Sequence, residues 1–235
     1  MNGKLYLIPT TLGDSPIINV IPNYVIEIIN QTNHYIVEDV KTARRYLIKS
    51  GIKTKIDDLT FYTLNKHSSP QEYESYLTPI SEGFHVGIIS EAGAPGVADP
   101  GADIVKIAHE KNIEVVPLVG PSSILLSVMA SGLNGQNFAF NGYLPIQKTD
   151  RIKTLKELEK RSYIEKQTQL FIETPYRNNH LIEDIVSACS PDTMLCIAAD
   201  ITLDTEFIKT KPIKEWKKQV PDLNKRPAIF LLLKR

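Results

Sequence analysis

Short apolar runs alternate along the chain with segments in which apolar residues recur at helical spacing. An apolar run bounded by Gly, Pro or polar residues is typical of a buried strand, and a spacing of three or four is typical of an amphipathic helix. The runs predict strands over 4–8, 35–37, 85–89, 114–117, 169–172, 195–199, 206–210 and 228–233, and a strand with its turn over 138–145. The periodic segments predict helices over 20–30, 42–47, 71–82, 103–111, 124–131, 151–163 and 180–189. The alternation up to the strand over 114–117 predicts a parallel sheet with right-handed crossovers, and the chain as a whole is expected to be α/β.

The stretch Leu118-Val-Gly-Pro-Ser-Ser123 interrupts this alternation near the middle of the chain. A length of 235 residues fits one large domain or two small ones. A Gly-Pro pair followed by two hydroxyl residues suits a hinge. We therefore expect an N-terminal α/β domain over 1–119 and a C-terminal α/β domain over 120–235.

Composition places the chain among ordinary globular proteins, with 42% hydrophobic and 23% charged residues. No apolar run is long enough to span a bilayer, and the first residues lack the apolar core of a signal peptide. Cys189 and Cys196 lie in apolar surroundings and are expected to be buried thiols. The five histidines are scattered, which argues against a protein-held metal. By elimination, these features favour a cytoplasmic protein with no membrane partner.

The net charge of zero is unevenly distributed along the chain. Residues 1–120 hold 10 Lys and Arg against 14 Asp and Glu, whereas residues 121–235 hold 17 against 13. A mildly basic half is compatible with a polyanionic partner, but it also occurs in proteins that bind none. The basic segment 151–163 fits a solvated surface helix better than an RNA clamp.

The chain is organised around Ser90-Glu-Ala-Gly-Ala-Pro-Gly-Val-Ala-Asp-Pro-Gly101, which follows a predicted strand and precedes a helix. Open α/β sheets bind ligands at such strand ends. Glycine and proline make a rigid loop that presents main-chain groups to a ligand. The glycine spacing matches neither a Rossmann fingerprint nor a P-loop, so a ligand here would lack phosphates. The alternative is a turn that only links strand to helix.

Further loops at predicted strand ends are 9–13, 38–39 and 173–177, with 120–123 at the hinge. None supplies a Ser-His-Asp, Cys-His or metal-binding set. Hydroxyls, a few carboxylates and exposed backbone suit the positioning of a reactive cosubstrate better than covalent catalysis.

Four motifs in order resemble the tetrapyrrole methylase superfamily, and among its branches the bacterial 16S rRNA (cytidine-2′-O)-methyltransferases. They are the central loop, Pro117-Leu-Val-Gly-Pro-Ser-Ser, Phe140-Asn-Gly-Tyr-Leu-Pro and Glu173-Thr-Pro-Tyr-Arg. The resemblance runs from Lys4 nearly to the C-terminus. It departs from the rRNA branch at Glu38-Asp-Val-Lys41, where that branch reads Glu-Asp-Thr-Arg, and at Asp200-Ile-Thr-Leu-Asp, which lacks an arginine.

The resemblance implies two α/β/α domains, a homodimer and an S-adenosyl-L-methionine cofactor in a cleft between the domains. The implied cofactor-binding residues are Pro9, Ser90, Glu91, Ala92, Gly93, Val97, Ser122, Ser123, Tyr143, Leu144, Ala199, Pro227 and Ala228. Within this set the central loop would meet the methionine and ribose, and the residues near Ala199 and Ala228 would flank the adenine.

The resemblance predicts methyl transfer to a ribose 2′-hydroxyl of RNA, with 16S rRNA or the small ribosomal subunit as the partner. The hydroxyl must lose a proton, and the candidate catalytic carboxylates are Glu38, Asp39 and Glu173. Each could instead cap a loop or form a salt bridge. Two other functions stay open, namely transfer to a small molecule such as a tetrapyrrole, and binding of cofactor or RNA without transfer. A basic rim would favour RNA, and a narrow apolar chamber a small acceptor.

Overall fold

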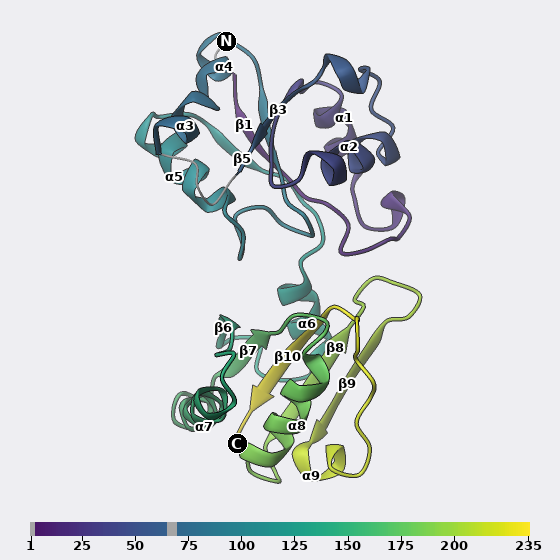
Figure 1. Ribbon diagram of the computed structural model, residues 1–235, viewed down its shortest axis with the longest axis vertical. Coiled ribbons are helices and arrows are strands. Elements are labelled where there is room, and N and C mark those ends of the chain that lie inside the picture. Colours follow the sequence, from purple (N-terminus) through teal and green to yellow (C-terminus); the bar gives the residue numbers. More distant parts are fainter. Residues whose placement is uncertain (1–2, 65–69) are drawn as a thin grey trace. The chain divides into compact units, whose positions relative to one another are not determined.

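The chain divides into two compact units, an N-terminal unit that ends at Ser122 and a C-terminal unit that begins at Ser123. The computed structural model describes residues 3–64 and 70–235 (Figure 1). The sequence-based boundary, between 119 and 120, lies three residues earlier. Within the described residues, no helix combines the length and apolar character needed to cross a membrane.

The N-terminal unit is built on a parallel sheet in the order β3-β2-β4-β1-β5. The strands are β1 (Leu5–Ile8), β2 (His34–Val37), β3 (Thr60–Thr63), β4 (Val86–Ile89) and β5 (Val115–Pro117). The predicted parallel sheet is confirmed in this unit. The edge strand β3 was not predicted, because its half-exposed residues form no apolar run.

Helices cover both faces of this sheet (Figure 1). One face packs against α1 (Asn23–Ile29) and α2 (Val40–Lys49), and the other against α3 (Pro70–Ser75), α4 (Thr78–Ser81) and α5 (Gly101–Glu110). Short 3₁₀ turns lie at Ile17–Asn19 and Ile56–Asp58. The prediction of one helix over 71–82 was wrong, because Pro79 lies in the first turn of a separate helix, where its missing N–H costs nothing. Ser69, expected to open that helix, lies outside the described residues.

The C-terminal unit has a mixed sheet in the order β6-β7-β10-β8-β9. Its strands are β6 (Phe138–Tyr143), β7 (Thr168–Ile172), β8 (Met194–Ala199), β9 (Phe207–Pro212) and β10 (Ala228–Leu233). Only β6 and β7 pair in parallel, and the other three neighbouring pairs are antiparallel. The short connection from β8 to β9 holds no crossover helix, and it can join only antiparallel neighbours.

One face of the mixed sheet carries the apolar core of this unit. It packs against α7 (Lys148–Glu165), α8 (Asn178–Ala188) and α9 (Ile213–Trp216). The helix α6 (Ser123–Ser131) packs on β8, β9 and β10. Cys189 and Cys196 are buried free thiols, as predicted.

Candidate functional site

The N-terminal sheet has a topological switch point between β1 and β4. These strands are neighbours, and the chain leaves β1 through α1 toward β2 but leaves β4 through α5 toward β5 on the other side. The two crossover helices pack on opposite faces. Crevices at the carboxyl ends of such strands are where open α/β sheets bind ligands. The fold therefore brings the loops 9–13 and 90–101 together at a place suited to binding.

Hydrogen bonds join these two loops directly. The backbone N–H of Thr10 donates to the carbonyl oxygen of Gly93 at 2.9 Å, and the Thr10 hydroxyl donates to the carbonyl of Ser90 at 3.2 Å. The Ser90 hydroxyl donates to the Gly93 carbonyl at 2.7 Å. All three residues are buried, so these bonds form away from water and fix the start of the central loop.

The central loop needs glycine at two turns and a carboxylate that accepts hydrogen bonds from its backbone. Gly93 and Gly96 both have φ of +78°, a conformation that glycine adopts without steric cost. The Asp99 carboxylate accepts hydrogen bonds from the N–H groups of Gly96 at 2.8 Å and Gly101 at 2.7 Å. A Cβ at Gly93 would lie 3.1 Å from the carbonyl oxygen of Pro121. The segment after β5 therefore closes against the loop as well.

The predicted cofactor residues of this unit fall into a buried and an exposed group. Pro9, Ser90 and Gly93 are buried and hold the loops in place, and the Pro9 carbonyl accepts a hydrogen bond from the Tyr46 hydroxyl. The side chains that reach solvent are Glu91, Ala92 and Val97. Ser122 is half-buried at the end of the unit. A ligand at this edge would meet the exposed group and the adjoining main chain.

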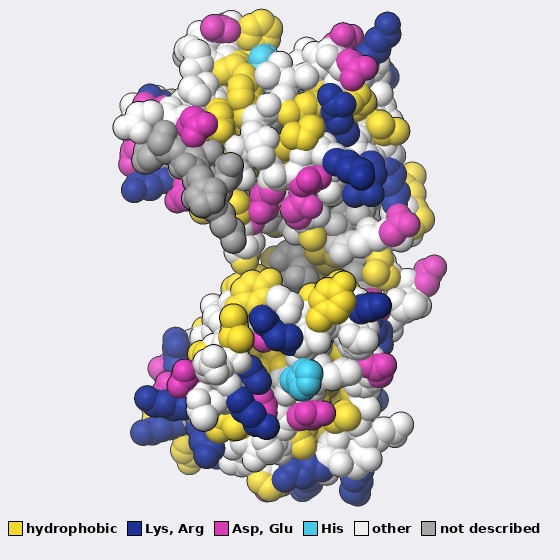
Figure 2. Space-filling model, in the orientation of Figure 1, with side chains coloured by type: hydrophobic (Ala, Val, Ile, Leu, Met, Phe, Trp, Pro, Cys, Tyr) yellow, Lys and Arg dark blue, Asp and Glu magenta, His cyan; other side chains and the backbone are white. Residues whose placement is uncertain are grey.

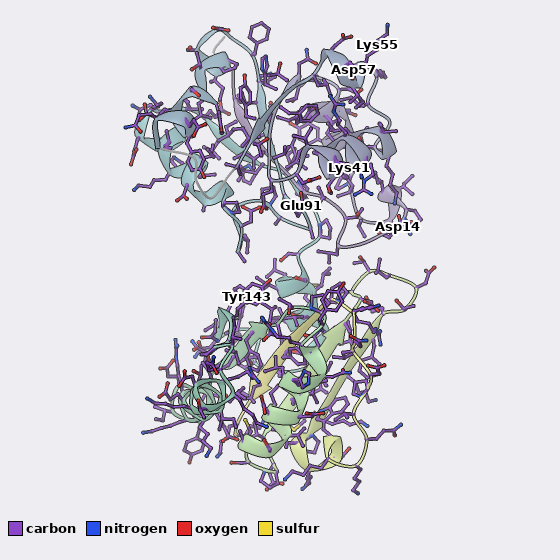
Figure 3. The ribbon with its side chains drawn as sticks, viewed as in Figure 1. Asp14, Lys41, Lys55, Asp57, Glu91 and Tyr143 are labelled. Carbon is purple, nitrogen blue, oxygen red and sulfur yellow. The ribbon has the colours of Figure 1, made fainter. Side chains whose placement is uncertain are left out.

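Two carboxylates lie close together at the ends of β2 and β4. Asp39 caps α2 by accepting a hydrogen bond from the Thr42 N–H at 2.6 Å, and this bond lowers the pKa of the Asp39 carboxyl. The pKa of Glu91 is raised, first by partial burial of its carboxyl and then by the negative charge of Asp39. Figure 3 shows Glu91 at this edge of the unit. Glu38, the third acid here, is half-buried.

The predicted residues of the C-terminal unit lie at one end of the strands of its sheet. Tyr143 of β6 pairs with Ile172 of β7, and Ala199 of β8 pairs with Ala228 of β10. Tyr143 is exposed, with its side chain visible in Figure 3, whereas Leu144 is buried in the core. Pro227 lies beside Ala228, and Ser123 begins α6.

Glu173 follows β7 at the same end of the sheet, where its buried carboxylate forms an ion pair with the partly exposed Arg177. Its carboxylate lies 2.6 Å from the Arg177 guanidinium and accepts a hydrogen bond from the Thr174 N–H at 2.7 Å. Glu173 is thus the anchor of the turn that joins β7 to α8. These contacts give it a structural task whether or not it takes part in chemistry.

Two charged residues that hold nearby segments in place were not among the site residues predicted from the sequence. The Asp200 carboxylate accepts a hydrogen bond from Arg226 at 2.7 Å, which fixes the segment that leads into Pro227. Arg151 is buried on α7 and donates to the carbonyl of Ile146 at 2.7 Å, although the helix was expected to be a solvated surface. The position of Asp200 directly after a strand was the available signal for the first. No sequence signal indicated the burial of Arg151, because its partner Asp184 on α8 is distant in sequence.

Within residues 3–64 and 70–235 there is no group of three or more His, Cys, Asp or Glu side chains arranged to hold a metal ion.

Comparison with known proteins shows what the chain as a whole is similar to. No protein-family profile matches the chain. The ribosomal RNA small subunit methyltransferase I of Escherichia coli O157:H7 is 29% identical over 234 residues, which cover 98% of this chain and 77% of that protein. The same enzyme of Haemophilus influenzae is 26% identical over 235 residues, covering 99% of this chain and 79% of that protein. The chain is homologous to small-subunit rRNA methyltransferases.

A solved structure supports the same fold. The crystal structure of the methyltransferase CobJ superimposes with a TM-score of 0.65 at 15% identity, covering 99% of this chain and 94% of that one. At this identity the likeness shows the fold alone. The predicted resemblance and the tetrapyrrole methylase-like fold are thus confirmed.

Proposed function

We propose that this protein is an S-adenosylmethionine-dependent methyltransferase that acts on a ribose 2′-hydroxyl of small-subunit rRNA. The observation that carries the proposal is homology to rRNA methyltransferases over 98% of the chain. The methyltransferase class predicted from the sequence is confirmed by these relatives. The ribose atom and the residues that serve it are our proposal, and so is action in the cytoplasm, where ribosomal subunits reside.

The central loop fits this cofactor in charge and in shape. Residues 90–101 include two acids, Glu91 and Asp99, and no Lys or Arg. Such a loop suits a sulfonium cation and disfavours a phosphate. The glycines keep the backbone free of Cβ atoms, so a ligand can approach main-chain groups. We assign the methionine and ribose parts to the exposed side chains Glu91, Ala92 and Val97 of the N-terminal unit and to the main chain beside them.

Removal of the acceptor proton is the step for which the protein must supply a group. S-adenosylmethionine, when bound, supplies a methyl group that is already activated. The chain then has to orient the hydroxyl, exclude water and take up its proton. Asp39 is a weak base, because its lowered pKa and its bond to Thr42 hold it in the ionised, capped state. Partial burial raises the pKa of Glu91, which makes its carboxylate a stronger base than that of Asp39, so we assign the proton to Glu91 and a supporting charge to Asp39.

The proposed enzyme acts as a homodimer. The helix α6 turns Ser127 and Ser131 inward, while Leu125 and Met129 are 55% and 76% exposed. An exposed apolar helix face is a common interaction surface. A second copy of the chain would cover it, which supports the homodimer that the resemblance implies.

Calorimetry followed by a transfer assay tests the proposed function. We expect S-adenosylmethionine and S-adenosylhomocysteine to bind with micromolar Kd, and labelled methyl groups to enter small ribosomal subunits that lack ribose methylation. Nuclease digestion of the product should place the label on a 2′-O-methylnucleoside. Binding without any transfer to RNA would remove the rRNA acceptor. It would favour a small-molecule acceptor or a protein that only binds.

A further inference from the structure

The N-terminal unit concentrates its positive charge in one segment. Residues 1–120 hold 10 Lys and Arg, and six of them lie between Lys41 and Lys55. No Asp or Glu occurs from Val40 to Ile56, although this half of the chain is acidic as a whole. The segment comprises α2 and the connection toward β3. Most of this unit's cations are therefore delivered by one helix and the loop after it.

The structure places four of these cations on α2 and the other two on the connection that follows it. Ala43, Tyr46 and Leu47 are buried against the sheet. Lys41, Arg45 and Lys49 follow one another at intervals of four, so they share the opposite, exposed face. Lys53 and Lys55 are also exposed. We call Lys41, Arg44, Arg45, Lys49, Lys53 and Lys55 the α2 strip. In Figure 2 Lys and Arg side chains gather over this side of the unit, and Figure 3 labels Lys41 and Lys55 along it.

Few of these charges are neutralised within the described residues. Lys49 pairs with the fully exposed Asp14 at 2.6 Å, and Arg44 lies 3.7 Å from the exposed Asp57 while its guanidinium covers the Phe61 ring. The part of the chain that the structure describes offers no ion pair to Lys41, Lys53 or Lys55. Exposed pairs of this kind are weak and exchange readily for another anion.

The α2 strip begins beside Asp39 and Glu91, the carboxylates proposed to act on the ribose hydroxyl. Asp39 caps α2, and the charge of Arg45 acts on both Asp39 and Glu91. A helix of ten residues extends about 15 Å, which matches the axial length of about four phosphate repeats along one strand of a duplex. By contrast, the cations of α7 are interspersed with Asp150, Glu157 and Glu165. The α2 strip thus combines unbalanced charge with proximity to the chemistry.

We propose that the α2 strip binds the phosphodiester backbone of the RNA acceptor and guides its ribose to Glu91 and Asp39. This inference rests on the proposed rRNA acceptor. It identifies the acidic N-terminal unit, rather than the basic C-terminal half, as the main electrostatic contact. Backbone contacts of this type fix register and orientation without reading sequence.

A triple variant tests the proposal against a matched control. The variant Lys41→Gln/Lys49→Gln/Lys53→Gln removes three exposed charges. It leaves Arg44, which packs on Phe61, and Arg45, whose charge acts on Asp39 and Glu91. The control Lys153→Gln/Lys156→Gln/Lys160→Gln makes the same charge change on the exposed face of α7. Binding of unmodified 16S rRNA transcript is measured by filter binding from low to high salt, and S-adenosylhomocysteine binding by calorimetry.

We expect the α2 variant to bind RNA at least tenfold more weakly at low salt. The slope of log affinity against log salt should fall by about two to three, because each lost phosphate contact contributes about 0.7 to 0.9. Its S-adenosylhomocysteine affinity should stay within twofold of wild type, and the control should match wild type in all three measurements. The single variant Lys41→Gln, with an expected slope change of about one, serves if the triple variant does not fold.

Two results would overturn the inference and leave the proposed function standing. In one, the α2 variants keep wild-type affinity and slope while wild type methylates RNA. In the other, the α7 control loses as much affinity as the α2 variant. If wild type binds the cofactor but neither binds nor methylates rRNA, the proposed acceptor fails and the α2 inference fails with it.

Discussion

Thr10 donates its backbone N–H to the carbonyl oxygen of Gly93 at 2.9 Å, so the loop after β1 is bonded to the turn of the central loop after β4. The Thr10 hydroxyl adds a second tie to Ser90 at 3.2 Å. Both loops lie at the switch point of the sheet. Neighbouring strands that are 80 residues apart in sequence thus become one binding edge.

The variant Thr10→Val should loosen this edge while keeping the side-chain shape. The hydroxyl is buried, so its loss should cost about 1 kcal/mol in the free energy of unfolding and weaken S-adenosylhomocysteine binding several-fold. Chemical denaturation and calorimetry measure the two effects. Thr11→Val is the control, since Thr11 is only half-buried and makes no side-chain hydrogen bond within the described residues. Equal affinity in the two variants would contradict a role for the Thr10 tie.

The pair Gly93→Ala and Gly96→Ala should separate backbone strain from close packing. Both residues have φ of +78°, so alanine should cost each variant about 1 to 2 kcal/mol. At Gly93 the new Cβ would also lie 3.0 Å from Leu12 Cδ2 and 3.1 Å from the Pro121 carbonyl, whereas at Gly96 it meets nothing within 4 Å.

We therefore expect Gly93→Ala to be the less stable of the two and to lose more cofactor affinity. Thermal unfolding and calorimetry on both proteins give the comparison. If the two variants behave alike, packing between the loops does not shape the site.

The sequence could predict these loops but not all of their contacts. The apolar runs before Pro9 and Ser90 identified the strand ends, and glycine spacing identified the turns, because both signals are local. The order of strands in the sheet is set by long-range pairing. The hydrogen bond between Thr10 and Gly93 could therefore be found only from the structure.

The local sequence pattern also failed to predict burial where a distant residue compensates a charge. Arg151 lies in a helix rich in Lys and Glu, yet it is buried because Asp184 of a distant helix compensates its charge. The antiparallel pairing of β8, β9 and β10 could not be predicted, since apolar runs do not encode strand direction. Glu91 was selected for its main chain, and only the structure brings its carboxylate beside Asp39.

The pH dependence of methyl transfer should report Glu91. Its raised pKa means that Glu91 keeps its proton to higher pH than an ordinary glutamate, so activity should rise with pH as it ionises. Asp39→Asn removes a negative neighbour and should lower the pKa of Glu91, which moves this rise to lower pH. Asparagine caps helices well, so α2 should stay intact.

Carbon-13 NMR titration of the glutamate carboxyl groups and pH–rate profiles give the two measurements. Glu91→Gln should abolish the rise and reduce kcat by about 10² to 10⁴. Full activity in Glu91→Gln would remove this residue from the proposed mechanism.

Glu173→Gln should affect stability more than chemistry. The change leaves Arg177 without its ionised partner, and because Arg177 is partly exposed we expect a loss of about 1 to 2 kcal/mol. The value of kcat at a temperature where the variant is folded should stay within a few-fold of wild type. A loss of more than 100-fold in kcat with unchanged stability would instead support Glu173 as a catalytic carboxylate.

The exposed apolar face of α6 leads to a prediction about assembly. Met129 is 76% exposed, while Ser131 on the same helix is buried and accepts a hydrogen bond from the Thr210 hydroxyl at its carbonyl. Leu125 and Met129 lie one turn apart on α6, so together they form an exposed apolar face of the kind that a second copy of the chain could cover.

Light scattering at micromolar concentration should therefore give a dimer for wild type and a monomer for Met129→Asp, because a buried, unpaired carboxylate opposes association. Ile164→Asp is the matched control. Ile164 is 65% exposed on α7, away from α6 in sequence, and this variant should remain a dimer. A dimer that survives Met129→Asp but not Ile164→Asp would move the interface to α7, and a monomeric wild type would show that neither face joins two copies.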